Sequence, residues 1–252
     1  MGNRAAYTSL LRGLAVLEAI GQGERSITAL AARFRLDASA MSRLVSALES
    51  DGWVTRTPDG PRFGPRASVL GRSSLQRDAA HHAQTLTHLV AGITGCDVTI
   101  SVLSGGRGYQ LAAGIGRVPL HDYPEILDPF PLWATAGGLA MASQLSDDEA
   151  VALLPPEPMA RYTANTMTTH ADFRSRLGEI RRWGYVVEEE EFAPGVGCVS
   201  VPWRIPGFDL PGAMVCIGPV DQIRETRSRL ERVLRAATSP GATESSVLAR
   251  SH

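Results

Sequence analysis

Residues 26–66 decide the fold of the N-terminal third of the chain and read SITALAARFRLDASAMSRLVSALESDGWVTRTPDGPRFGPR. Thr28 and Asp37 have side chains that cap helix N-termini, so we expect a short helix to begin at each of them. The second of these helices is amphipathic, because its apolar residues recur at i, i+3, i+4 and i+7: Met41, Leu44, Val45 and Leu48. Two β-prone runs around the Pro-Asp-Gly-Pro turn at 58–61 then predict a hairpin.

A further amphipathic helix precedes this stretch, since Leu10, Leu14, Leu17 and Ile20 recur at three- and four-residue spacing. Three short helices and a hairpin form a winged helix-turn-helix, whose third helix is of a size to enter a DNA major groove. The candidate DNA-contacting residues are Thr28, Ser39, Ala40, Ser42, Arg43, Arg56 and Arg62. Two other interpretations stay open: an ordinary solvated helix also carries Ser and Arg, and some enzymes use a winged helix only to dimerise.

The charge is divided unevenly along the chain. Residues 1–75 hold ten Arg and six acidic residues, a net charge of +4, whereas the remaining 177 residues hold 15 Arg and 20 acidic residues, a net charge of −5. A basic head on an acidic body indicates two domains with different partners, and the head is the candidate binder of a polyanion.

Composition excludes several classes of protein. The chain has 252 residues, 44% apolar and 20% charged, which is typical of a globular protein and unlike disordered, collagen-like or coiled-coil sequences. The apolar N-terminal segment is interrupted by Arg12 and Glu18, so we expect neither a signal peptide nor a membrane span. We therefore expect a cytoplasmic protein. The three cysteines lack CxxC spacing and the six histidines lack metal-ligand spacing, so we expect no metal site and no cofactor.

The remainder alternates strands and helices, which predicts an α+β domain. We expect a domain at 1–66, a helical linker at 67–82, a second domain at 83–237 and a flexible tail at 238–252. The four prolines between 119 and 131 hold an extended segment, and the small-residue run ATAGG at 134–138 opens a helix. Such a helix start either lets a ligand approach the backbone or serves tight packing.

Residues 26–66, read together with LGEIRRWGYVVEEEEFAPGVGCVSVPW at 177–203, resemble the IclR-type bacterial transcriptional regulators. The resemblance covers roughly residues 7–237 and implies a winged helix-turn-helix followed by a GAF-like effector-sensing domain. It also implies a dimer or tetramer that binds a pseudo-palindromic operator in double-stranded DNA and responds to a small molecule. The matching effector positions are Ala136, Gly137, Glu188, Cys198, Val215 and Ile217.

Two of these positions depart from the family pattern. Val215 and Ile217 stand where relatives often carry hydroxyl residues, so we expect a larger effector with a substantial apolar body, either aromatic or cationic. Glu188 should repel an anion beside it and favour a hydrogen-bond donor or a cation. The alternative is that Val215 and Ile217 close the cavity and leave a vestigial sensor.

The chemical alternatives are weaker. The acidic run 188–191 is typical of a solvated strand end, although it could pair carboxylates, and Cys198 is better explained as a small buried thiol than as a nucleophile. A methyltransferase-like enzyme remains the alternative function, but SGGRG at 104–108 lies in a predicted hairpin and not in a cofactor loop.

Overall fold

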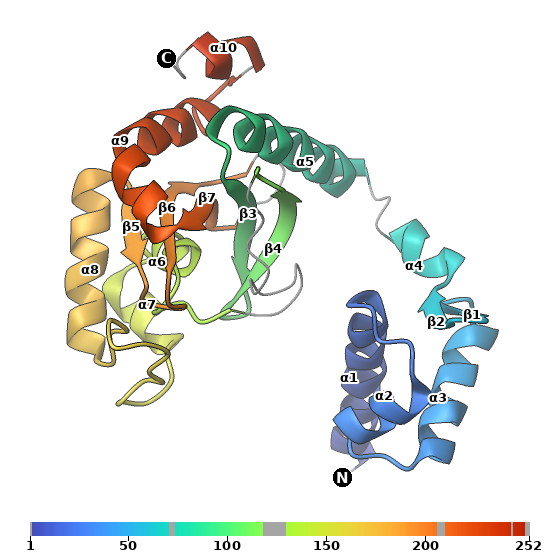
Figure 1. Ribbon diagram of the computed structural model, residues 1–252. Coiled ribbons are helices and arrows are strands. Elements are labelled where there is room, and N and C mark those ends of the chain that lie inside the picture. Colours follow the sequence, from blue (N-terminus) through green and yellow to red (C-terminus); the bar gives the residue numbers. More distant parts are fainter. Residues whose placement is uncertain (1, 71–73, 118–129, 206–209, 243, 250–252) are drawn as a thin grey trace. The chain divides into compact units, whose positions relative to one another are not determined.

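The structure is a computed structural model that describes residues 2–70, 74–117, 130–205, 210–242 and 244–249 (Figure 1). It divides into two compact units, Met1–Arg77 and Asp78–His252. The division falls inside the expected linker, 67–82. Most of the Pro-rich segment that we expect to be extended falls on residues 118–129, outside the described residues.

Unit 1 is a winged helix-turn-helix. Helices α1 (Gly2–Gly21), α2 (Ile27–Arg33) and α3 (Ala38–Ser50) are followed by an antiparallel hairpin of β1 (Val54–Thr57) and β2 (Gly60–Phe63), and by α4 (Pro65–Leu70). Val16 and Ile20 of α1, Leu30 of α2, and Met41 and Val45 of α3 are buried together. The predicted α3 stripe therefore forms the core of the unit, with Leu44 and Leu48 packed against it.

The structure confirms the predicted N-cap of α3 and corrects that of α2. Asp37 caps α3, and its carboxylate accepts the backbone N–H of Ala40 at 2.8 Å. The cap of α2 is Ser26 and not Thr28: Ser26 has an extended backbone and its hydroxyl accepts the N–H of Ala29 at 3.2 Å. Thr28 lies within the first turn, where its own backbone is already helical.

The α1 stripe is also split between two environments. Leu17 and Ile20 reach the core, but Leu10 is 61% and Leu14 is 49% exposed. The buried face of α1 is formed by Val16, Ala19 and Ile20. At roughly 100° per residue, Leu14 lies about 200° around the helix from Val16, so the predicted stripe is wider than the face that packs against the core.

Unit 2 is built on one antiparallel sheet with strand order β4-β3-β7-β6-β5. Its strands are β3 (Asp97–Ser104), β4 (Arg107–Gly114), β5 (Val186–Glu189), β6 (Val196–Trp203) and β7 (Gly212–Pro219). Its helices are α5 (Ser74–Thr94), whose first turn belongs to unit 1, α6 (Ala136–Ala142), α7 (Asp147–Ala152), α8 (His170–Trp183), α9 (Val220–Ala237) and α10 (Glu244–Ala249). This arrangement confirms the α+β class.

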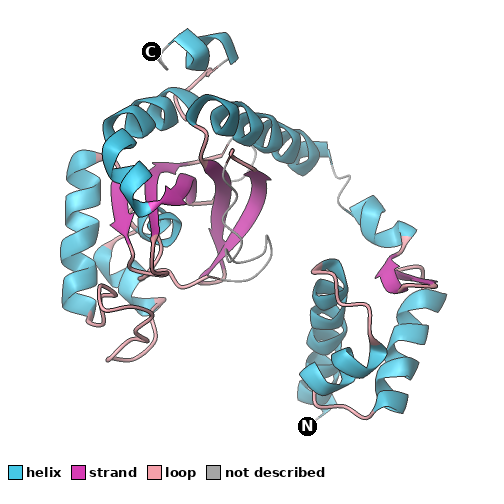
Figure 2. Ribbon diagram, in the orientation of Figure 1, coloured by secondary structure: helices cyan, strands magenta, loops and turns pink. Residues whose placement is uncertain are grey.

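Helices cover both faces of the sheet (Figure 2). Alternate strand residues such as Ile100, Val199 and Met214 pack against α5 and α9. The intervening residues face α6 and α8, so Val215 and Ile217 belong to the second core with Leu139 and Leu177. The three central strands β3, β6 and β7 are buried on both faces, so the sheet provides a rigid floor beneath α6.

The C-terminal stretch differs from the expected flexible tail. After α9 the chain forms α10, and the side chain of Val247 is fully buried in the core on the α5 and α9 face. The composition of 238–252 is rich in Ser, Thr and Gly, but a single well-placed Val is enough to dock a short helix.

Candidate functional site

The exposed face of α3 carries a hydrogen-bonded series at its N-terminus. The hydroxyl of Ser39 donates to Asp37 Oδ1 at 2.5 Å, and Arg43 Nη1 donates to Ser39 Oγ at 3.1 Å. The Ser39 hydroxyl and the Ala40 N–H lower the pKa of Asp37. Because each member fixes the next, Arg43 is held along the helix surface before it meets any ligand.

Arg56 on the hairpin is bound to the same helix. Its Nε lies 3.0 Å from Glu49 Oε2, and its Nη2 donates to Ser46 Oγ at 2.7 Å and to the carbonyl of Ser42 at 3.3 Å. Arg62 on β2 pairs instead with Asp59 in the turn at 3.0 Å. The structure thus brings Arg56 onto the outer face of α3, at Ser42 and Ser46, and leaves Arg62 on the opposite arm of the hairpin.

All seven candidate DNA-contacting residues lie in unit 1. Thr28, Ser39, Arg43, Arg56 and Arg62 are exposed, and Ala40 and Ser42 are half-buried. An exposed helix with hydroxyl and guanidinium groups, flanked by a basic hairpin, has the chemistry that contacts base edges and phosphates.

The six candidate effector residues are close together on the α6 face of the sheet. Glu188, Cys198 and Ile217 are register neighbours across β5, β6 and β7. A Cβ built on Gly137 would lie 3.2 Å from Val215 Cγ2, so the start of α6 rests directly on β7. Ala136 is buried in the same core.

The small residues of α6 allow this close approach. A Cβ on Gly138 would lie 2.6 Å from both Cα and O of Leu132, a separation that real Cβ atoms do not show. The hydroxyl of Thr135 caps the helix by accepting the N–H of Gly138 at 3.2 Å. Of the two interpretations of ATAGG, tight packing therefore accounts for Gly138 directly.

Glu188 is not part of a solvated strand end. Its side chain is 2% exposed, and Oε1 accepts the backbone N–H groups of Glu191 and Phe192. Burial raises the pKa of Glu188, against the opposing influence of a hydrogen bond with Cys198. The expectation failed because the turn after β5 folds back over the carboxylate, a contact that strand periodicity does not report.

Glu191 shares this environment. Its pKa is raised to about 7, chiefly by burial, and Arg176 Nη2 lies 3.5 Å from its Oε1. Thr163 and Thr166 donate to the carbonyl of Glu191, which fixes the turn to the loop before α8.

Other polar residues on the α6 face were not anticipated. Thr99, Ser101 and Gln110 are buried, and Thr99 is the register neighbour of Val215. The signal was available, because Thr99 and Ser101 alternate with apolar residues along β3. Val215 therefore lies between Thr99 and Ser200, and the face keeps hydroxyl groups although positions 215 and 217 carry none.

Comparison with known proteins decides the family. The IclR helix-turn-helix domain matches residues 9–58, and the C-terminal domain of the bacterial transcriptional regulator IclR matches residues 75–240. The chain belongs to the IclR family. It is a DNA-binding transcriptional regulator with the two domains that define this family.

Individual IclR relatives agree with this assignment over most of the chain. The transcriptional repressor IclR of Escherichia coli (strain K12) is 26% identical over 228 residues, which is 87% of this chain and 82% of the relative. The acetate operon repressor of Salmonella typhimurium is 28% identical over 201 residues, covering 76% and 73%.

Solved IclR structures share the fold. An IclR regulator from Alicyclobacillus acidocaldarius superposes with a TM-score of 0.76 at 21% identity, covering 97% of this chain and 99% of that one. An IclR homologue from Microbacterium hydrocarbonoxydans, crystallised with 4-hydroxybenzoate, gives 0.74 at 22% identity, covering 96% and 99%.

The chemical alternatives considered from the sequence gain no support. The relatives are transcriptional regulators, and the methyltransferase-like alternative finds no support among them. Cys96, Cys198 and Cys216 are all buried, and desolvation raises the pKa of Cys96 and of Cys216 away from the thiolate form that a nucleophile requires. Among the described residues no cluster of three or more His, Cys, Asp or Glu could hold a metal ion, and no helix is long and apolar enough to cross a membrane.

Proposed function

We propose that the protein represses transcription in the cytoplasm by binding a pseudo-palindromic operator as a dimer, and that a small molecule bound in unit 2 modulates this. In this proposal Ser39, Ala40, Ser42 and Arg43 approach base edges in the major groove. The observation that carries it is the exposed, pre-ordered series on α3, in which Ser39 holds Arg43. Relatives from Escherichia coli and Salmonella are named repressors, which supports the sign of regulation.

The hairpin arginines have separable roles. Arg62 carries an exposed guanidinium whose partner, Asp59, is itself 73% exposed, so a phosphate can replace that partner with little loss of stability. Arg56 both braces α3 through Ser46 and presents positive charge beside the helix. We assign both to the sugar-phosphate backbone.

Selection from a random-sequence DNA pool tests this interface. Arg43→Ala should weaken operator binding by about 1 to 3 kcal/mol and blur the selected sequence, because a base contact is lost. Arg62→Ala should weaken all sequences alike and reduce the dependence of log K on log salt by about one unit. An unchanged selected sequence for Arg43→Ala would show that α3 is not the recognition helix.

The exposed apolar residues of unit 1 support self-association. Among the side chains of this unit that the structure describes, the large exposed apolar ones are Leu10, Leu11, Leu14, Phe63, Val69 and Leu70. A second copy that covers the α1 leucines would give the two-fold symmetry that a palindromic operator requires. Leu10→Glu combined with Leu14→Glu should lower the dimer fraction in sedimentation velocity, whereas Leu248→Glu, an exposed leucine in unit 2, should not.

For the effector we propose a molecule with an aromatic or branched apolar body and at least one hydrogen-bonding group. Val215 and Ile217 supply apolar surface under α6, and the Phe130 ring is near the start of the same helix, 3.8 Å from where a Cβ on Gly137 would lie. Thr99 and Ser101 supply hydroxyl groups on the same face. Since Glu188 is already engaged by the backbone of its own turn, it adds little attraction for a cation.

Ligand-induced thermal shifts of the full chain test the effector class. 4-Hydroxybenzoate, the molecule bound by the Microbacterium homologue, represents the proposed class, and pyruvate and glyoxylate represent small keto acids. We expect a shift with the aromatic compound that the double variant Val215→Ser with Ile217→Ser loses. Val199→Ser, on the α9 face of the same sheet, is the matched control and should keep it. Tight binding of pyruvate or glyoxylate by the unaltered protein would contradict the proposal.

A further inference from the structure

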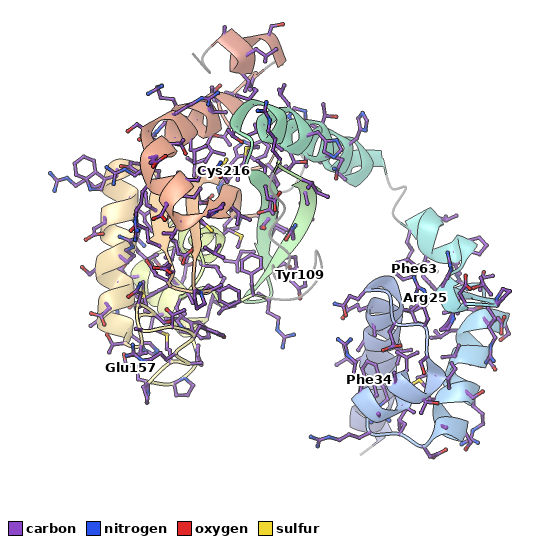
Figure 3. All side chains as sticks on the ribbon, in the orientation of Figure 1. Arg25, Phe34, Phe63, Tyr109, Glu157 and Cys216 are labelled. Atoms are coloured by element: carbon purple, nitrogen blue, oxygen red, sulfur yellow. The ribbon has the colours of Figure 1, made fainter. Side chains whose placement is uncertain are left out.

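Arg25 joins the end of α1 to the hairpin, two parts of unit 1 that are distant from each other in sequence. It lies half-buried in the connection between α1 and α2, close to Phe63 of β2 (Figure 3). Its Nη1 donates to the carbonyl of Ile20 at 2.7 Å and to the carbonyl of Pro61 at 3.0 Å. The first acceptor lies at the end of α1, and the second belongs to the hairpin.

The hairpin packs closely against this connection at both ends of β2. A Cβ on Gly60 would lie 2.2 Å from the backbone oxygen of Arg25, and a Cβ on Gly21 would lie 2.5 Å from the Phe63 ring. The apolar contact and the close backbone approach fix the distance between β2 and α1. The Arg25 guanidinium adds directional hydrogen bonds, which fix orientation as well.

The two arms of the hairpin are therefore held by different arginines. Arg56 ties β1 to α3, and Arg25 ties β2 to the end of α1. A two-stranded hairpin of four-residue strands has little stability of its own, so its orientation depends on such ties.

We propose that Arg25 is a positioning residue for DNA binding: it orients the hairpin so that Arg62 meets the sugar-phosphate backbone. This rests on the DNA interface proposed above. Arg62 on β2 is the register neighbour of Thr55 and lies one residue from Pro61, whose carbonyl Arg25 binds. Without that bond the arm samples more orientations, and DNA binding must then order it.

A double-mutant cycle on the full-length protein tests the proposal. Affinity for a duplex selected by the unaltered protein is measured by fluorescence anisotropy over a range of salt concentrations. The variants are Arg25→Ala, Arg62→Ala, Arg43→Ala and the two doubles that combine Arg25→Ala with each of the others. Arg33→Ala, which removes the same charge from α2, is the matched control.

We expect Arg25→Ala to weaken binding at least threefold beyond Arg33→Ala and to lower the salt dependence by about one unit, as Arg62→Ala does. Added to Arg62→Ala it should change affinity by less than about twofold, whereas added to Arg43→Ala its effect should multiply in full. The sequence selected from a random pool should stay unchanged, which distinguishes a loss of hairpin orientation from a general loss of the fold.

Two outcomes overturn the inference alone: effects of Arg25→Ala and Arg62→Ala that multiply, or an Arg25→Ala affinity equal to that of Arg33→Ala. If Arg43→Ala and Arg62→Ala both leave affinity unchanged, the DNA interface and this inference fail together. Should Arg25→Ala be unfolded at the assay temperature, Arg25→Gln, which keeps part of the stem, enters the same cycle under the same criteria.

Discussion

The ionisation of Glu191 should make the free energy of unfolding of unit 2 depend on pH. Its side chain is 14% exposed, and Oε2 is buried without a hydrogen-bond partner among the described residues. The charges that face it are Arg176, which favours its ionised form, and Glu188 and Glu189, which disfavour it. Glu191→Gln keeps the shape and removes the ionisation.

The sign follows from proton binding. The pKa of Glu191 is raised to about 7 in the folded protein from an ordinary value of 4.5, so between these values the folded state holds a proton that the unfolded state has lost. The contribution of Glu191 to the free energy of unfolding is therefore fully present below pH 4.5 and is lost as the pH rises through about 7. At roughly 1.4 kcal/mol per pKa unit, the loss is about 3 kcal/mol.

Urea unfolding at several pH values between 4.5 and about 8 measures this loss. Tryptophan fluorescence reports mainly on unit 2, which contains Trp133, Trp183 and Trp203. The free energy of unfolding of Glu191→Gln, relative to that of the unaltered protein, should rise by about 3 kcal/mol across this range. Glu179→Gln removes the other carboxylate paired with Arg176, at 3.1 Å, and should show no such growth. A constant difference for Glu191→Gln would refute the reasoning.

Three further predictions concern backbone and coupling. Arg35 has φ 53° in the turn before α3, a strained backbone conformation for a residue other than Gly. Arg35→Gly should therefore raise the stability of unit 1 by roughly 0.5 to 1 kcal/mol in thermal unfolding. A lower unfolding midpoint would show that the Arg35 backbone is not strained. Gly138→Ala should destabilise unit 2 by about 2 kcal/mol or more, because its Cβ meets the Leu132 backbone, whereas Gly178→Ala, with open space, should stabilise it by about 0.5 to 1 kcal/mol. A flexible Gly-Ser insertion before Ser74, where α5 begins, should preserve ligand shifts but abolish the effect of the ligand on operator affinity; an undiminished effect would exclude mechanical coupling through this segment.

The features that sequence predicted best are those that local interactions determine. The α3 stripe and the Asp37 cap depend on residues within one or two turns, so both were predictable. The α2 boundary was missed by two residues because Ser26 and Thr28 have the same capping chemistry and only backbone conformation separates them. Periodicity identified the α1 helix but could not say that Leu10 and Leu14 are exposed while Ile20 is buried, because burial depends on how the other helices pack against α1.

Long-range contacts account for what sequence left out of the effector site. The resemblance to the family brought Glu188, Cys198 and Ile217 to one face, and strand register places them side by side. It did not show that residues 191 and 192 return to bind Glu188, or that Thr99 lies beside Val215, since these contacts depend on how the turn and the strands fold together. The loss of hydroxyls at 215 and 217 therefore changes the position of polar groups and does not remove them.

The arginines proposed to meet DNA are each engaged within unit 1 before DNA arrives. Arg43 bonds to Ser39 beside the Asp37 carboxylate, Arg56 pairs with Glu49, and Arg62 pairs with Asp59. Each phosphate contact must replace an acidic partner, so its net gain is smaller than that of an unpaired guanidinium. The same acids weaken the phosphate contacts with any DNA alike, because these contacts do not depend on sequence, whereas base contacts on α3 add only at the correct sequence. We therefore expect the six acidic residues among the first 75 to lower DNA affinity overall, and discrimination between sequences to depend on the base contacts made by α3.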